Sequence, residues 1–174
     1  MPATPSAQMQ SAGFADQPAD QDAEHPAALP AAGPAEYLEH ANVTVHQLDA
    51  ATRFLLAALP TWRVRGEGTM DWFGKPIAWR HVGTDTHYIA LQGGGEGSVP
   101  HWQTHQVGVK HLGIVVPDLA ALTARLAEIG CAPDHPGGAH PHRKSVYYTA
   151  DDLVQVEFMQ YLALAPAQRN DYLA

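Results

Sequence analysis

Two histidines stand at matching places in two similar stretches of the chain. His40 lies near the start of residues 38–45, and His111 lies near the start of residues 110–118. Both stretches alternate between polar and apolar residues, which is typical of a half-buried strand. The sequence therefore predicts two related strands that each carry one imidazole on the face away from the core.

A carboxylate completes a possible metal-binding set. Glu157 lies in the alternating stretch 153–161, among apolar residues, where an unpaired charge would be costly. Two imidazoles and one carboxylate that converge in a cleft form a divalent-metal site with open positions for water or substrate. The alternative is that each histidine merely caps the edge of a strand while Glu157 pairs with Arg143 or Lys144.

The elements needed to position these residues occur in the same order in each half of the chain. Each half predicts a strand, a helix and three further strands, so we expect an internal repeat that folds as one unit. The fold class is then α+β, with two βαβββ modules that form a curved mixed sheet around a cleft. In the first half we expect a strand at 37–46, a helix capped by Asp49, and strands at 62–68, 76–82 and 87–92. In the second half we expect a strand at 109–116, a helix between Asp118 and Gly130, and strands at about 131–135, 143–149 and 153–161.

The domain boundaries follow changes in composition. Residues 1–34 are rich in Ala, Pro, Gln and Asp and have almost no large apolar side chains, so we expect a disordered leader. A folded domain is expected at 35–165, with module 1 at about 37–97, a linker at 98–107 and module 2 at about 108–165. Residues 166–174 form a C-terminal tail.

Composition limits the function classes. The 174 residues carry a net charge of −8, which argues against nucleic acid or an anionic membrane surface as a partner. No apolar run is long enough to span a bilayer, and the first basic residue is Arg53, which argues against a secretory or transit peptide. The single cysteine, Cys131, is expected to be a small core residue. One cysteine cannot form an intrachain disulfide, which is consistent with the reducing cytoplasm.

Other histidines and aromatic residues give weaker signals. The pair His140 and His142 flanks a proline and has no acidic or cysteine neighbour, so it is a poor metal motif. His101 and His105 lie in the linker and are expected to be exposed. The aromatic residues of module 1 are expected in the core or in the wall of the cleft; they are Trp62, Trp72, Phe73 and Trp79.

Four motifs resemble the vicinal oxygen chelate superfamily, which includes glyoxalase I, methylmalonyl-CoA epimerase, extradiol dioxygenases and fosfomycin-resistance transferases. They are residues 38–45, 88–92, 110–118 and 156–161, and the resemblance covers about residues 37–162. It implies paired βαβββ modules that form a cup around a divalent metal: Zn, Ni, Co, Mn or Fe(II). His40, His111 and Glu157 match three of the family's four ligand positions.

The fourth ligand position separates two kinds of chemistry. The spacing from the preceding turn places Ala90 where Glu157 stands in the second half, whereas Gln92 takes that place only if the strand shifts by two residues. A His/Gln/His/Glu set resembles methylmalonyl-CoA epimerase. Two histidines and one carboxylate resemble the extradiol dioxygenases and fosfomycin-resistance transferases. Turn spacing favours Ala90, and both alignments remain open.

The resemblance implies a metal-dependent lyase, isomerase or dioxygenase-type enzyme that acts on a small oxygen-chelating substrate. Glu157, or a bound water, would move protons, and Arg143 would hold a substrate carboxylate or phosphate. Asn42, Gln92 and Tyr161 would contact the substrate. The alternatives are a metal-free drug-binding protein of the bleomycin-resistance type and a scaffold with a vestigial cleft. A homodimer is plausible because paired modules leave sheet edges to cover.

Overall fold

The computed structural model describes residues 36–150 and 153–173, and its elements belong to one compact unit, Tyr37–Ala174. The expected leader at 1–34 and the turn residues Asp151 and Asp152 lie outside the described residues. The first module contains β1 (His40–Thr44), α1 (Leu48–Ala58), β2 (Arg63–Trp72), β3 (Lys75–Gly83) and β4 (Tyr88–Gln92). The second contains β5 (His111–Val115), α2 (Leu119–Glu128), β6 (His135–Pro136), β7 (Arg143–Tyr148) and β8 (Gln155–Tyr161), and the short helix α3 (Pro166–Arg169) follows.

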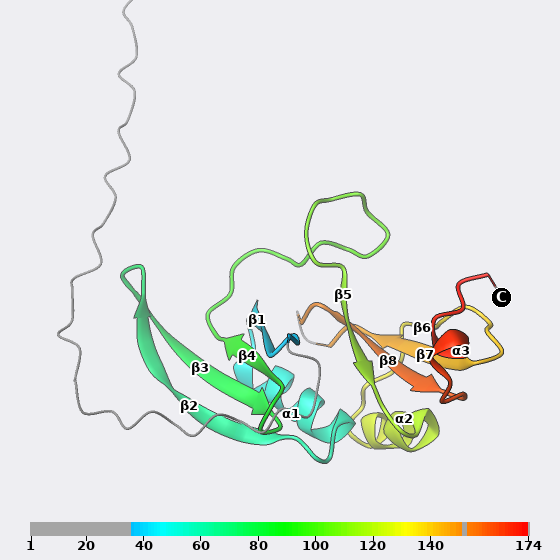
Figure 1. Ribbon diagram of the computed structural model, residues 1–174. Helices are drawn as coiled ribbons and strands as arrows, with labels where there is room; N and C mark the ends of the chain where they lie inside the picture. Colours follow the sequence, from blue (N-terminus) through cyan, green and yellow to red (C-terminus); the bar gives the residue numbers. More distant parts are fainter. Residues whose placement is uncertain (1–35, 151–152, 174) are drawn as a thin grey trace, which may run out of the picture. The chain divides into compact units, whose positions relative to one another are not determined.

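Each module forms a four-stranded mixed sheet with the same strand order (Figure 1). The orders are β1-β4-β3-β2 and β5-β8-β7-β6, and in both sheets the first strand runs parallel to the last. The remaining neighbours are antiparallel. The prediction of an α+β fold with two βαβββ modules is therefore confirmed.

The two modules share one hydrophobic core. The helices α1 and α2 pack against each other, and both lie on the same side of the sheets (Figure 1). Phe54 of α1 contacts two aromatic residues of module 2, with ring centroids 6.1 Å from Tyr148 and 6.0 Å from Phe158. All three rings are almost completely buried. Because the apolar faces of both sheets meet this core, the polar faces of β1, β4, β5 and β8 are left for a site.

The two long helices begin differently, which corrects one expectation. Asp118 caps α2, because its carboxylate accepts hydrogen bonds from the backbone amides of Ala120 and Ala121. Asp49 was expected to cap α1, and that prediction is wrong. The helix begins at Leu48, so Asp49 lies within its first turn, where its carboxylate pairs with Arg80 instead.

The β2–β3 hairpin is longer than its sequence indicated. Its turn is Phe73–Gly74 rather than Gly74–Lys75, and both turn residues have positive φ, 50° and 81°. This conformation matches the twist of two-residue hairpins. Trp72 and Phe73 are 47% and 92% exposed at the tip, so the expectation that they line the core or the cleft is wrong.

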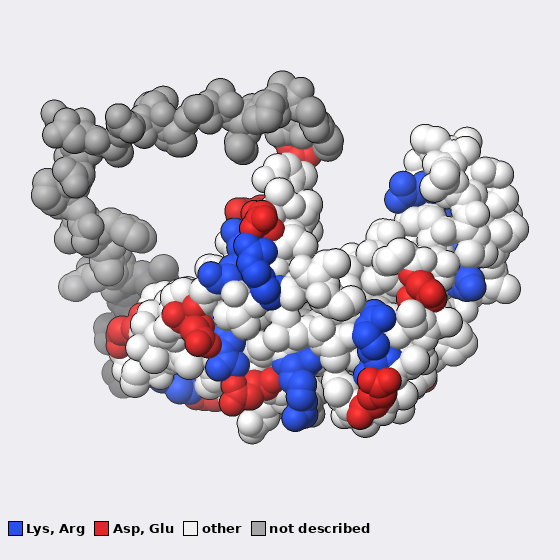
Figure 2. All heavy atoms as spheres, turned by 90° about the horizontal axis from the view of Figure 1, so that it is seen from below, with Lys and Arg blue, Asp and Glu red and all other residues white. Residues whose placement is uncertain are grey.

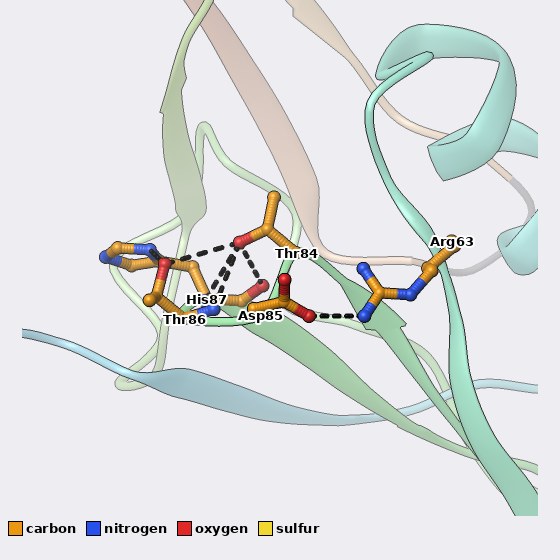
Figure 3. Close-up of polar contacts among 5 residues, drawn as sticks. All are labelled: Arg63, Thr84, Asp85, Thr86 and His87. Atoms are coloured by element: carbon orange, nitrogen blue, oxygen red, sulfur yellow. Dashed lines mark hydrogen bonds and ion pairs between the residues drawn. The ribbon is translucent and has the colours of Figure 1, made fainter.

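The β3–β4 connection is a compact polar turn (Figure 3). The Thr84 hydroxyl accepts hydrogen bonds from the backbone amides of Thr86 and His87, and Arg63 of β2 pairs with Asp85. Gly83 then pairs with Tyr88 at the start of β4. This turn sets the register of β4 and therefore decides which of its residues reach the candidate site.

The second strand of module 2 is shorter and later than expected. A strand was predicted at 131–135, but β6 comprises only His135 and Pro136. Pro133 and Pro136 lack the backbone N–H group that a ladder needs, which keeps this edge strand short. Cys131 packs against the hydrophobic core, as expected for a small apolar residue.

Charged groups are mixed on the surface. On the face drawn in Figure 2, Lys and Arg side chains lie beside Asp and Glu side chains and form no large patch of one sign. Arg80 illustrates this mixing, because it contacts the carboxylates of both Asp49 and Glu67. Within the described part of the chain, no helix has the length and apolar character needed to cross a membrane.

Candidate functional site

Glu157 occupies the middle of the polar face of the second sheet. In β8 it pairs with Gly113 of β5 on one side and with Tyr147 of β7 on the other. Because side chains alternate along a strand, His111 lies on this same face, two residues before Gly113. Val156 and Phe158 point into the core, so the predicted alternation of β8 is confirmed.

The Glu157 carboxylate is buried and has two polar neighbours. The residue is 8% exposed, and its Oε2 atom lies 3.4 Å from Nε2 of His111. The Tyr147 hydroxyl donates a hydrogen bond to the carboxylate, and burial together with this bond raises the pKa of Tyr147 to about 12. The phenol therefore stays protonated near neutral pH and holds the carboxylate in place.

A cavity of about 380 Å³ opens beside this carboxylate. Glu157 and Tyr147 lie at one part of its wall, and Arg143 and Lys144 from the start of β7 supply positive charge. Tyr161, at the end of β8, lines it as well. The structure thus places the predicted residues Arg143 and Tyr161 around the same cavity as Glu157.

A stack of rings supports Tyr147 from the side of β6. The His135 ring lies parallel to the Tyr147 ring with centroids 4.5 Å apart, and the linker residue Trp102 packs on His135 at 4.6 Å. The His111 ring meets Tyr147 edge-on at 5.6 Å. This packing restrains Tyr147 on both sides and so fixes the direction of its hydroxyl group.

The polar face of module 1 carries the other predicted histidine. His40 and Asn42 are exposed on β1, as their alternation predicted. Nδ1 of His40 lies 3.0 Å from a carboxylate oxygen of Glu39, and its ring stacks on Tyr88 at 4.8 Å. A carboxylate accepts a hydrogen bond from Nδ1–H, which leaves the lone pair on Nε2, the arrangement typical of metal-binding histidines.

The stack on Tyr88 extends across the sheet into β3. His81 lies 4.7 Å from Tyr88, and Trp79 lies 4.8 Å from His81, between ring centroids. Burial lowers the pKa of His81, and the charges of Arg65 and His40 lower it further. Trp79 therefore does form part of the wall of this face.

Strand register shows which residue of module 1 corresponds to Glu157. Ala90 pairs with Asn42, two residues after His40, just as Glu157 pairs with Gly113, two residues after His111. Ala90 thus has the place in module 1 that Glu157 has in module 2. Gln92 is buried further along β4 and pairs with Thr44 and Trp79.

The spacing of two of the three donors fits a metal ion. With metal–ligand bonds of about 2.0–2.2 Å, two donors of one ion lie about 3.0–3.5 Å apart, which matches the 3.4 Å between His111 and Glu157. Across residues 36–150 and 153–173, however, no three His, Cys, Asp or Glu side chains are grouped as a metal ion requires. The structure therefore brings two of the three expected ligands together, and His40 remains on the face of the other sheet.

Sequence reasoning missed Tyr147 and gave His140 little weight. Tyr147 shares a strand face with Arg143, so alternation alone could have placed it beside the cavity. Its pairing with Glu157 depends on the register between β7 and β8. The turn residues in the sequence did not define that register exactly. His140 lines the cavity from the loop before β7.

Comparison with known proteins identifies the fold. No family model and no curated protein sequence matches the chain. A glyoxylase/bleomycin resistance protein/dioxygenase domain from Frankia sp. EAN1pec is 22% identical with a TM-score of 0.57, over 72% of this chain and 98% of that one.

Two further solved structures share the architecture at lower identity. Glyoxalase I from Leishmania major is 17% identical with a TM-score of 0.54, over 72% of this chain and 86% of that one. The fosfomycin resistance protein FosX from Listeria monocytogenes, in a complex with Mn(II) and sulfate, is 15% identical with a TM-score of 0.56, over 79% of this chain and 98% of that one. The chain therefore has the fold of the vicinal oxygen chelate superfamily.

Proposed function

We propose that the protein is a divalent-metal-dependent enzyme of the lyase, isomerase or dioxygenase type that acts on a small molecule with neighbouring oxygen atoms. One observation carries this proposal: the His111 imidazole and the buried Glu157 carboxylate meet at 3.4 Å beside a cavity of about 380 Å³. Ligand sites combine a concave pocket with a few converging polar groups, and this pair supplies such groups at the edge of the cavity.

His111 and Glu157 would hold the metal, and His40 is the third proposed ligand. Two observations support His40 as a ligand. His40 begins β1 just as His111 begins β5. The Glu39 carboxylate binds Nδ1 of His40, which leaves the Nε2 lone pair for a metal. The FosX protein from Listeria monocytogenes, which has the same fold, was solved with Mn(II). Zn, Ni, Co, Mn and Fe(II) all accept this combination of nitrogen and oxygen donors.

The chain's own residues suit proton transfer on a bound substrate. When bound, the metal would act as a Lewis acid that stabilises negative charge on substrate oxygens. Glu157 is the proposed proton acceptor, and the hydrogen bond from Tyr147 holds its carboxylate in one orientation. Arg143 and Tyr161 line the cavity where the substrate would lie. Asn42 and Gln92 are proposed to contact the substrate from the sheet of module 1.

The position of Ala90 narrows the choice of chemistry. Because strand pairing places Ala90 opposite Asn42, module 1 offers no carboxylate or amide at the place equivalent to Glu157. The ligand set is then two histidines and one carboxylate, which favours the dioxygenase or transferase side of the superfamily over the epimerase side. Gln92 would reach that place only through a shift of two residues, which the β3–β4 turn opposes.

A metal-free binding protein is the second candidate. The grouping of only two possible ligands among the described residues favours it, and so does the row of rings formed by His40, Tyr88, His81 and Trp79. Such a row can stack against a flat ligand without any metal.

Metal binding by the full-length protein decides between the two candidates. We expect about one equivalent of Mn(II), Fe(II), Ni(II), Co(II) or Zn(II) by elemental analysis and calorimetry, lost in His111→Ala and Glu157→Gln and weakened in His40→Ala. His105→Ala, which removes an exposed linker histidine, is the matched control and should bind as the wild type does. A folded protein that binds none of these metals but takes up a flat aromatic ligand would establish the metal-free candidate.

The identity of the metal would narrow the reaction further. Fe(II) would favour dioxygenase chemistry, Mn(II) a transferase, and Ni(II), Co(II) or Zn(II) the glyoxalase or epimerase side.

A homodimer is also proposed, since β1 and β2 are the edge strands of one sheet and β5 and β6 are the edge strands of the other. Light scattering on the purified protein tests that assembly.

A further inference from the structure

The segment after β8 lies against the loop that precedes β7. Two side chains bind its backbone: Nη1 of Arg143 donates to the carbonyl oxygens of Arg169 and Asp171, at 3.1 and 3.0 Å. Nε2 of His140 lies 3.0 Å from the same carbonyl oxygen of Asp171. One backbone oxygen therefore receives hydrogen bonds from two basic side chains that both line the cavity beside Glu157.

Ring contacts bring the same segment to the cavity wall. The guanidinium group of Arg169 lies 4.0 Å above the Tyr161 ring, and that of Arg143 lies 5.3 Å from the Tyr172 ring. Tyr172 itself lines the cavity together with Glu157. Residues 166–173, which we call the C-terminal cover, thus contact side chains that line the cavity and contribute Tyr172 to its wall.

The C-terminal cover is held by polar and ring contacts rather than by burial. Its helix α3 has four residues and none of them is buried. Tyr172 is 80% exposed and Leu173 is 99% exposed. A segment with so little buried apolar surface opens locally at a small free-energy cost.

A negatively charged oxygen is a better acceptor for these donors than a peptide carbonyl. A carboxylate or phosphate can accept two parallel hydrogen bonds from a guanidinium group and adds the attraction of opposite charges, which a peptide carbonyl does not offer. Lys144 adds a second permanent positive charge to the cavity wall, and Glu157 is the one acidic residue among the described residues that line it. The charge of this end of the cavity therefore suits an anion.

We propose that Arg143 and His140 form an oxyanion subsite in which the carbonyl oxygen of Asp171 stands in for a carboxylate or phosphate oxygen of the ligand. The ligand takes over both donors, and the C-terminal cover is displaced as it binds. The inference rests on the proposed function, because the subsite belongs to the same cavity, and it specifies the substrate class as a small molecule that carries an oxyanion.

The test uses the full-length protein in chelator-containing buffer, so that it does not depend on metal. Inorganic phosphate and acetate are titrated separately by calorimetry, while hydrogen exchange is followed in peptides that cover residues 163–173. We expect one of the two anions to bind and to speed exchange in the C-terminal cover. Binding of phosphate alone assigns a phosphoryl-type group, and binding of acetate alone assigns a carboxylate.

Variants separate the subsite from the cover. Arg143→Gln should weaken anion binding about tenfold or more, since it removes a charged donor. Arg169→Ala removes the ring contact with Tyr161 and should strengthen anion binding several-fold, because the competing cover is then held less tightly. Arg53→Ala, an exposed arginine of α1, should leave binding unchanged.

Two results would overturn the inference: neither anion changes hydrogen exchange at residues 163–173, or Arg169→Ala binds the anion no more tightly than the wild type. A protein that binds metal but shows either result keeps the proposed function and loses the subsite. A protein that binds no metal but shows the expected displacement keeps the subsite and loses the metal-dependent function.

Discussion

At the scale of single residues, the most demanding feature is the buried carboxylate of Glu157. Burial of an isolated charge is expensive, so the carboxylate requires compensation from its neighbours. Here the Tyr147 hydroxyl supplies a hydrogen bond and the His111 imidazole lies within 3.4 Å. Neither neighbour satisfies the carboxylate as fully as a bidentate arginine would. The roles proposed for Glu157, metal ligand and proton acceptor, would use the acceptor capacity that these neighbours leave.

Two strand glycines give a sharp test of local packing. A Cβ atom at Gly83 would overlap the backbone carbonyl of His87, whereas a Cβ atom at Gly113 would meet nothing within 4 Å. We expect Gly83→Ala to lower the free energy of unfolding by about 1–3 kcal/mol, because backbone cannot move aside as a side chain can. Gly113→Ala should be neutral or slightly stabilising.

Urea denaturation of the two glycine variants measures both effects. Equal stabilities would contradict the close approach between Gly83 and the β3–β4 turn.

At the scale of elements, the two helices show how far a capping signal can be read from sequence. Asp118 and Asp49 were both expected to cap a helix, yet of the two only Asp118 accepts hydrogen bonds from helix amides. The residue that precedes α1 is Gln47, which makes no side-chain cap bond. A shift of the helix start by two residues would make Asp49 the cap, and the sequence pattern does not resolve such a shift.

The difference in capping predicts a difference in stability. Asp118→Ala should lower the free energy of unfolding by about 1 kcal/mol, because two backbone amides of α2 lose their acceptor. Asp49→Ala should cost less, since it removes an exposed ion pair with Arg80 and a favourable interaction with the helix dipole. Thermal and chemical unfolding of both variants would refute the assignment if Asp49→Ala proved the more damaging.

Strand alternation was the most reliable signal at this scale. It correctly separated the polar face of β1, with His40 and Asn42, from the face that packs on the core. The strand prediction failed at β6, where prolines shorten the strand. The expectation for Trp72 and Phe73 rested on their apolar character, and both are exposed at the tip of the β2–β3 hairpin. Apolar character indicates burial only where neighbouring elements are available to cover the side chain.

At the scale of the whole molecule, the shared core makes the two modules interdependent. Phe54 of module 1 packs against Tyr148 and Phe158 of module 2, and all three lie in one hydrophobic cluster. Most of the buried apolar side chains that the structure describes, from both modules, belong to this cluster. We therefore expect one cooperative unfolding transition for the described part of the chain.

Removal of one ring from the shared core tests this interdependence. Phe54→Ala should destabilise the protein by about 3–5 kcal/mol, because it leaves a cavity between the modules. Phe73→Ala, which removes a ring that is 92% exposed at a hairpin tip, should change stability little. Two separate transitions, followed by far-UV and near-UV circular dichroism, would show that the modules fold independently.

The sequence by itself determined the repeat, the faces of the key strands and the residues that could bind a metal. Those features follow from side-chain alternation and from local helix and turn signals, which act within a few residues. His40, His111 and Glu157 were found in this way, as was the correspondence between Ala90 and Glu157.

Only the tertiary structure decided which of these residues meet. It brought His111, Tyr147 and Glu157 together across three strands, left His40 beside Glu39 and Tyr88, and placed the C-terminal cover over Arg143. These contacts depend on strand register and on how one segment docks on another. They are fixed by many weak interactions between residues distant in sequence, and no local pattern encodes them.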